Sequence, residues 1–380
     1  MRIYFDNAAS TALDERVMEA MLPSMKNFYG NPSSVHASGR EVRIAIEKSR
    51  KKVAELLNAS PSEIFFTSGG TEADNTALFC AIESYQVKHV ITSPLEHHAV
   101  LHPLQECSKK GLINLMYVEV DENGRINYEH LIELLQNNPH ALVSLMHGNN
   151  EIGNIYDIHA IGLICKEYKA FFHSDTVQTV GHYRHNLAQT PVNSIAGAGH
   201  KFHGPKGSGF LYVKKENKIH PLIYGGAQER NMRGGTENVY GIIGLAKALE
   251  IACEEMEPHR IHIENLKKHF LALLKLHIPG VGFNGLSADM EKSLYTVLNV
   301  SLPPSEGNRG MVLFNLDLEG IAASGGSACS SGASMGSHVL RALHISPDRD
   351  AVRFSFSRFN TLEEIDYTVG KLKELYTIEA

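Results

Sequence analysis

The sequence lacks several features that would assign it to particular classes of protein. It has no run of five or more basic residues and carries a net charge of −6 at pH 7, so nothing in it supports binding to nucleic acid. No apolar stretch approaches about 18 residues, the length that a membrane-spanning helix needs. The N-terminal stretch is polar from residue 6 onward and has no apolar core of the kind found in signal peptides. We therefore expect a cytoplasmic protein that binds neither nucleic acid nor a membrane.

Cysteine is also scarce, and the five cysteines are scattered along the chain and odd in number. This pattern argues against a disulfide framework and favours a reducing compartment. Cys80, Cys107, Cys165 and Cys253 lie in apolar helical patterns, where we expect them to pack without reacting. Only Cys329 is surrounded by glycine and serine, in a segment that could move and bring its thiol to a ligand.

What the sequence does contain is the composition of an ordinary globular enzyme, with 43% hydrophobic and 21% charged residues. Short apolar runs in the first half predict strands over residues 63–67, 88–92, 113–119, 141–146 and 170–174. Amphipathic patterns before and between these runs predict helices over residues 41–57, 71–84, 98–109, 128–137 and 158–168. This alternation predicts an α/β fold in which helices cover a mostly parallel sheet.

The pattern changes in the C-terminal part of the chain, and 380 residues are too many for one small core. A long helical pattern over residues 238–276, interrupted at Pro258, leads away from the sheet, and a second set of strand and helix patterns follows. We expect the N-terminal dozen residues to cross to this second unit. The predicted division is a large domain of residues 14–256 and a discontinuous, smaller α+β domain of residues 1–13 and 257–380.

Two residues in the middle of the chain carry the groups that pyridoxal phosphate (PLP) chemistry requires. Asp175 follows a strongly apolar run, where an unpaired carboxylate would cost several kcal/mol to bury and a cationic ring nitrogen would offset that cost. Lys201 follows small residues that leave room for a bulky group, and a lysine amine can bind an aldehyde cofactor covalently. Together with the nucleophile Cys329, these residues indicate PLP-dependent sulfur chemistry.

Further polar residues follow the predicted strands, at the edge where parallel sheets bind their ligands. The helix that begins near Gly70 and Thr71 could bind an anion through its N–H groups, although a simple capped helix start would read the same way. His97 could stack on an aromatic cofactor, or be an ordinary surface histidine. Asn150 lies in an Asn-rich segment that could bind a polar ligand or form only a turn.

His98 and His102 are spaced as two metal ligands on one helix could be. No cysteine or carboxylate completes a metal-binding set around them, so we expect no metal.

Nine motifs, in order along the chain, resemble one family. They are YFDNAA (4–9), YGNPSS (29–34), TSGGTE (67–72), NNEIG (149–153), GHK (199–201), GGAQER (225–230), RGGTEN (233–238), SAC (327–329) and RFS (353–355). From Tyr4 to Arg358 the chain resembles the NifS/IscS-type cysteine desulfurases, class V aminotransferase relatives with PLP fold type I. The resemblance implies an enzyme that converts L-cysteine to L-alanine and supplies sulfur for iron–sulfur clusters or other sulfur-containing molecules.

The resemblance also implies roles for individual residues toward the cofactor. Lys201 would hold PLP covalently and move the substrate α-proton, and His97 would stack on the ring. The other contacts would be Asp175 to the ring nitrogen, Gln178 to the ring oxygen, and Gly70, Thr71, His200 and Thr236 to the phosphate. Thr236 would come from the other subunit, which implies a homodimer.

For the substrate, the resemblance implies that Asn150 and Arg353 bind the carboxylate, a task that suits the guanidinium group. Arg358 is the rival arginine, which we expect to be structural. Cys329 would attack the substrate sulfur and become a persulfide, which a sulfur-acceptor protein such as an iron–sulfur scaffold would then receive.

One departure from the family pattern is Ala198, where members often have a hydroxyl residue; this loss of a phosphate donor predicts modestly weaker PLP retention. Three other functions stay open. A selenocysteine lyase or cysteine-sulfinate desulfinase would keep the PLP residues, and a related aminotransferase would not need Cys329. A dimer that serves only as a docking module would bind no PLP.

Overall fold

The computed structural model describes residues 2–305, 310–325 and 336–377, and its main feature is a seven-stranded sheet. In spatial order the strands are β2 (Ile64–Thr67), β8 (Gly209–Val213), β7 (Ser194–Ala198), β6 (Phe171–Asp175), β5 (Leu142–Ser144), β3 (His89–Thr92) and β4 (Asn114–Tyr117). The strand pairs from β7 to β4 are parallel, whereas β8 runs antiparallel to both of its neighbours. The predicted α/β fold with a mostly parallel sheet is confirmed.

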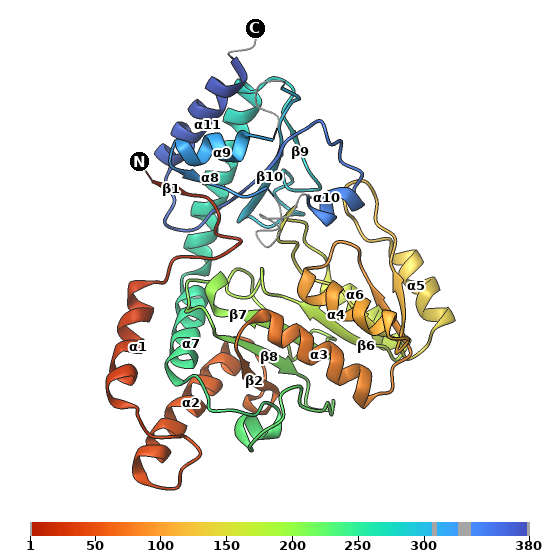
Figure 1. The fold of residues 1–380 in the computed structure, drawn as a ribbon, viewed down its shortest axis with the longest axis vertical. Helices are drawn as coiled ribbons and strands as arrows, with labels where there is room; N and C mark the ends of the chain where they lie inside the picture. The colour runs from red at the N-terminus through yellow and green to blue at the C-terminus, as the bar shows by residue number, and fades with distance from the viewer. Residues whose placement is uncertain (1, 306–309, 326–335, 378–380) are drawn as a thin grey trace.

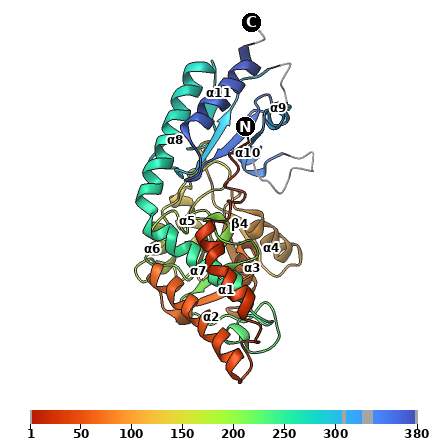
Figure 2. The ribbon, with the colours of Figure 1, turned by 90° about the vertical axis from the view of Figure 1, so that its left-hand side faces the viewer.

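Helices cover both faces of this sheet, which explains why its strands are apolar at successive positions. On β6, Phe172 packs with one helical layer and Phe171 with the other, because neighbouring side chains point to opposite faces. The first layer contains α1 (Glu15–Asn27), α2 (Ala37–Leu56), α5 (Tyr128–Asn137), α6 (Ile158–Glu167) and α7 (Val239–Glu254). The second contains α3 (Gly70–Ser84) and α4 (His98–Lys109) (Figure 2).

A second, smaller sheet lies above the first in Figure 1 and has its own apolar core. It is antiparallel, in the order β12 (Ala351–Ser355), β10 (Val297–Ser301) and β9 (Gly282–Phe283). The helices around it are α8 (Met256–His277), α9 (Val312–Leu318), α10 (His338–Ala342) and α11 (Leu362–Thr377). Figure 2 shows α8 running along one side of the molecule into this unit.

The N-terminal residues join the smaller unit, as expected. Strand β1 (Ile3–Tyr4) pairs in parallel with β11 (Ile321–Ala322). The ring of Phe5 packs edge-on against Phe356 at 5.6 Å between ring centroids. These contacts, together with the two separate apolar cores, support the division into residues 14–256 and residues 1–13 with 257–380, which we keep as a proposal.

The predicted strands and helices of the first half lie where expected, with ends shifted by a few residues. In the large sheet, strands β7 and β8 were not predicted, and neither were β1 and α1 near the N-terminus. In β7 the small residues are a packing requirement: a Cβ at Gly197 would lie only 2.3 Å from the Phe210 ring of β8. A run of alanine and glycine has low strand propensity, so this tertiary cause cannot be read from the local sequence.

The helix expected over residues 238–276 is in fact two helices, and the predicted break at Pro258 is wrong. The break falls at Glu255, between α7 and α8. Pro258 lies in the first turn of α8, where a missing N–H group breaks no helical hydrogen bond. Among the described residues, no helix is both long and apolar enough to cross a membrane.

Candidate active site

A cavity of about 210 Å³ lies at the carboxyl ends of the parallel strands. Its walls bring together residues from the ends of β6 and β7, the first turn of α3 and the loops before α4 and after β5. The lining residues are Ala9, Gly70, Thr71, Asp74, His97, Met146, Asn150, Asp175, Val177, Gln178, Ala198, His200 and Lys201. Every residue predicted to bind the cofactor, except Thr236, is in this set.

Asp175 is the last residue of β6, and its carboxyl group faces the cavity with few partners. The side chain is almost fully buried, and Oδ1 accepts a hydrogen bond from the Val177 N–H at 2.9 Å. Burial raises the pKa of this carboxyl group, while the Val177 N–H and the charge of Lys201 act in the opposite direction. A cation bound here would remove much of the cost of burying the carboxylate.

Lys201 follows β7, and the N-terminal segment crosses directly over it. Its Nζ donates hydrogen bonds to the backbone carbonyl of Ala8 at 2.6 Å and to that of Ala9 at 3.0 Å. The Gln178 side-chain amide donates to the same Ala8 carbonyl at 3.0 Å. The carbonyl groups of Ala8 and Ala9 are therefore part of the site, and nothing local in the sequence identified them.

The two histidines of the site are neutral near pH 7. Burial lowers the pKa of His97 to about 4, and the charge of Lys201 adds to the effect. The same causes lower the pKa of His200 to about 4. His97 caps α4 by accepting a hydrogen bond from the Ala99 N–H at 3.1 Å, which fixes the imidazole at the cavity wall. A neutral, fixed imidazole suits stacking against an aromatic ring.

The start of α3 has the form of an anion-binding helix terminus. Its N-cap residue, Gly69, provides no side chain to satisfy the N–H groups of the first turn, which leaves them available to an anion. A Cβ at Gly70 would lie 2.6 Å from the side chain of Val177, so only glycine fits. Together with the buried Asp175 and the neutral His97, this terminus gives the cavity the chemical form that PLP requires.

Arg353, on β12 of the smaller unit, lies beside the cavity and has a donor available. Its Nη2 forms an ion pair with Asp6 at 2.7 Å, and its Nη1 donates to the backbone carbonyl of Asn150 at 2.9 Å. The side chain is 1% exposed. Among the described residues, no acceptor lies within hydrogen-bond distance of its Nε.

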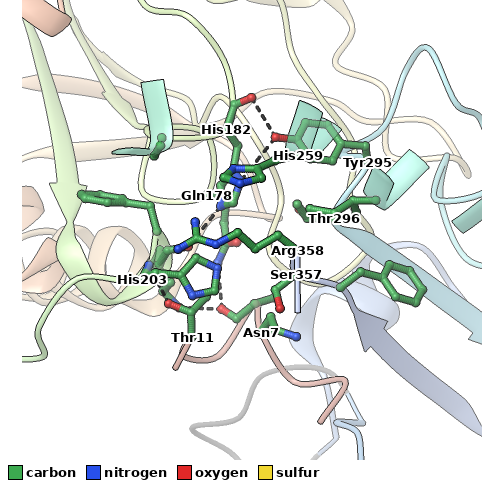
Figure 3. Close-up of a pocket in the computed structure, with 17 residues that line it drawn as sticks. Asn7, Thr11, Gln178, His182, His203, His259, Tyr295, Thr296, Ser357 and Arg358 are labelled. Atoms are coloured by element: carbon green, nitrogen blue, oxygen red, sulfur yellow. Dashed lines mark hydrogen bonds between the residues drawn. The ribbon is translucent and has the colours of Figure 1, made fainter. Parts of the chain in front are cut away.

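Arg358, the rival arginine, lines a different pocket, which shares Gln178 and Lys201 with the first cavity (Figure 3). It forms an ion pair with Asp14 and lies over the ring of Phe359, 4.8 Å from the ring centroid. The pocket measures about 20 Å³, the space of roughly one water molecule, and includes His182 and His203.

One residue predicted to bind the cofactor, Thr236, falls outside the cavity. Thr236 is exposed and lines a separate recess of about 150 Å³ with Arg233 and Asn238. Cys329 belongs to residues 326–335, which lie outside the described part of the chain. Ser337, which caps α10, donates its hydroxyl to the buried carboxyl group of Glu151.

His98 and His102 are hydrogen-bonded to each other, with 2.9 Å between Nδ1 of His98 and Nε2 of His102. Asp74, which sequence reasoning did not select, lines the cavity one helical turn after Gly70, and this spacing could have identified it.

The fold and the cavity define the family. The family model "Aminotransferase class-V" matches residues 3–368, and the chain belongs to this family. The chain is 43% identical over 377 residues to "Cysteine desulfurase IscS" of Dictyoglomus turgidum, which covers 98% of this chain and 94% of that protein.

Solved structures give the same assignment. A structure titled "NIFS-LIKE PROTEIN" superposes with a TM-score of 0.91 at 38% identity, covering 100% of both chains. Another, titled "SspA in complex with cysteine", has a TM-score of 0.81 at 29% identity and covers 94% of this chain and 100% of that one.

Proposed function

We propose that this protein is a PLP-dependent cysteine desulfurase that converts L-cysteine to L-alanine and retains the sulfur as a persulfide on Cys329. The observation that carries the proposal is the meeting of Lys201 and Asp175 in one cavity of a chain that aligns over almost its full length with cysteine desulfurases. PLP, when bound, supplies an electron sink for bonds at the substrate α- and β-carbons.

The chain's own residues would hold the cofactor on four sides. Lys201 would bind its aldehyde carbon, Asp175 would pair with the ring nitrogen, and His97 would cover the ring face. Gln178, whose amide nitrogen already contacts the N-terminal segment, would turn toward the ring oxygen. The α3 terminus at Gly70 and Thr71, with His200, would hold the phosphate.

The substrate would bind between the two units. The Nε of Arg353, which has no hydrogen-bond partner among the described residues, and the side chain of Asn150 would bind the substrate carboxylate. Asp6 would keep the guanidinium group oriented. Lys201 would take the α-proton and return protons to the substrate carbons. The carbonyls of Ala8 and Ala9 would hold its ammonium form near the cavity.

Sulfur transfer would then be a displacement at the substrate sulfur. The Cys329 thiolate attacks that sulfur, an S–S bond forms and the C–S bond breaks, and the electron pair left on carbon is protonated to give alanine. The other cysteines are poor alternatives: burial raises the thiol pKa of both Cys80 and Cys165 to about 12, so almost no thiolate forms at neutral pH.

The functional unit would be a homodimer in the cytoplasm. The exposed Thr236 lies away from its own cavity, which supports a role in the cavity of a partner subunit. The persulfide would pass to an acceptor protein, such as an iron–sulfur scaffold or another sulfur carrier. Selenocysteine lyase, cysteine-sulfinate desulfinase and class V aminotransferase activities are the alternatives that the same cavity could support.

The test is to measure alanine and sulfide released from L-cysteine in the presence of a thiol reductant. We expect equimolar products from the wild type and none from Cys329→Ala, with the visible absorbance of bound PLP unchanged. Cys253→Ala, which removes a half-buried cysteine on α7, is the matched control and should retain full activity. Undiminished turnover by Cys329→Ala would favour a lyase or aminotransferase, and protein without PLP absorbance would refute all of these activities.

A further inference from the structure

A second aspartate, Asp74, lies in the cavity wall beside Asp175 and has no role in the reaction described above. It follows Gly70 by four residues on α3, so the two lie on the same face of the helix, and both line the cavity. Asp74 is 1% exposed. A carboxyl group buried to this extent requires either a cation or a proton.

Asp74 begins a chain of hydrogen-bonding groups that leads from the cavity into the sheet. Its Oδ1 lies 3.2 Å from Nε2 of His173, and Nδ1 of His173 lies 2.9 Å from the Ser194 hydroxyl. His173 precedes Asp175 by two residues on β6, so their side chains share one face of the sheet. Ser194 is the partner of His173 in the pairing of β6 with β7. The register of β6 and β7 therefore brings His173 and Ser194 into this series of hydrogen bonds.

The charges around Asp74 do not balance if every carboxyl group is ionised. Asp74 and Asp175 both line the cavity, and Glu96 is buried nearby, whereas Lys201 is the one lysine or arginine among the described lining residues. Burial raises the pKa of Asp74 well above its usual range, and the charges of Asp175 and Glu96 raise it further. Burial also lowers the pKa of His173 to about 3, so this imidazole is neutral and cannot serve as the missing cation.

The contacts distinguish the two aspartates. Asp175 accepts a hydrogen bond from a backbone N–H group, which stabilises its charged form. Within the described part of the chain, the one recorded hydrogen-bond partner of Asp74 is His173. A neutral imidazole can accept a hydrogen bond from a carboxylic acid at Nε2 and donate one from Nδ1 to the Ser194 hydroxyl.

We propose that Asp74 is a positioning residue that remains protonated and donates a hydrogen bond to His173, so that Asp175 is the carboxylate that faces the ring nitrogen of the cofactor. This inference rests on the proposed function. If Asp74 were ionised, its charge would compete with that of Asp175 for the proton on the ring nitrogen. The chain of Asp74, His173 and Ser194 therefore keeps the ring nitrogen paired with a single carboxylate.

The experiment is infrared difference spectroscopy of the purified holoenzyme, which detects the carbonyl stretch of a protonated carboxyl group. We expect this band in the wild type at pH 7 and its loss in Asp74→Asn, which has the same shape and no proton to lose. Glu96→Gln is the matched control, because it removes a second buried carboxyl group and should leave the Asp74 band in place. His173→Phe removes the acceptor and should move the Asp74 band to higher frequency.

A second measurement follows the visible absorbance of bound PLP as the pH is varied. Asp74→Asn exchanges one neutral group for another, so the midpoint of the PLP absorbance change should move by less than about 0.5 pH unit. Asp175→Asn should move that midpoint by more than about 1 pH unit. An unchanged infrared band in Asp74→Asn, or a midpoint shift above about 0.5 unit, would overturn the proposal. The infrared band can also be recorded on protein stripped of PLP. A failure of the proposed function, seen as missing PLP or missing alanine, is therefore judged separately.

Discussion

Two arginines near the end of β12 illustrate how partners, rather than burial, decide what a buried charge can do. Arg353 and Arg358 are both largely removed from water, with side chains 1% and 10% exposed, and each forms an ion pair with an aspartate. The ion pair of Arg353 with Asp6 does not use Nε, which has no hydrogen-bond partner among the described residues. The guanidinium group of Arg358 instead lies against its own neighbours, Asp14 and Phe359, in a pocket with room for about one water molecule.

The difference suggests that one arginine is built to receive a ligand and the other to hold two chain segments together. Asp14 caps α1, and Arg358 follows β12, so their ion pair joins the two units of the molecule. The four predictions below test this comparison, from the largest expected effect to the smallest.

Arg353→Lys should lower kcat/KM for L-cysteine by about 100-fold, because a lysine keeps the charge but cannot hold Asp6 and a carboxylate at once. The loss should appear mainly in KM, while the absorbance of bound PLP stays the same. Steady-state alanine formation measures both. Arg358→Lys is the matched control and should stay within about threefold of the wild type. Equal losses of kcat/KM in the two variants would show that Arg353 and Arg358 do not differ in their role toward the substrate.

Arg358→Ala should reduce the free energy of unfolding by about 3 kcal/mol, because it leaves the Asp14 carboxylate buried with one partner fewer. Arg16 also pairs with Asp14 and limits the loss. Urea unfolding at pH 7 measures this value, and kcat/KM of the folded fraction should be nearly unchanged. A variant that is as stable as the wild type would show that the ion pair does not hold the units together.

The surroundings of Arg358 should also make stability sensitive to pH. Burial, with a contribution from Arg358, lowers the pKa of His203 to about 3 and that of His182 to about 4. Below pH ~6.5 the unfolded chain binds protons at these histidines, whereas the folded protein does not. The free energy of unfolding is therefore highest above pH ~6.5 and falls as the pH is lowered toward 4. We expect each of these two histidines to contribute about 2 kcal/mol to the loss of stability between pH 7 and pH 5.

The variant His203→Asn tests whether His203 causes part of this pH dependence of stability. Residue 203 has a φ of 67°, which asparagine tolerates, and its side chain donates to the Ala12 carbonyl, which an asparagine amide can also do. The variant should lose less stability between pH 7 and pH 5 than the wild type does. An identical pH dependence would remove His203 as a cause.

Ala198→Ser adds a hydrogen-bond donor to the wall of the cavity. Ala198 lines the cavity and is 1% exposed, so the new hydroxyl would have a polar partner only when the phosphate is bound. We expect PLP to dissociate about threefold to tenfold more slowly, as one added hydrogen bond of about 0.5–1.5 kcal/mol predicts. Dialysis followed by absorbance measures the PLP retained, and equal retention would show that the missing hydroxyl has no effect.

The part of the site that the sequence predicted comes from the large sheet. Thr71, His97, Asn150 and Asp175 follow apolar runs, and the carboxyl ends of parallel strands must meet at one edge, so local patterns were sufficient. The ion pair of Arg353 with Asp6 joins positions 347 residues apart, and no local pattern encodes such a contact.

The N-terminal segment cannot fold into its native position until the C-terminal part of the chain has been synthesised. Residues 3–9 leave the ribosome early, yet their partners Ile321, Arg353 and Ser355 are synthesised more than three hundred residues later. At about 5–20 residues per second, this delay is on the order of tens of seconds. During that time the strand Ile3–Tyr4 and the ring of Phe5 have no native surface to bury against. A nascent chain would therefore contain both Lys201 and the backbone carbonyls of Ala8 and Ala9 long before the smaller unit could fix those carbonyls in place.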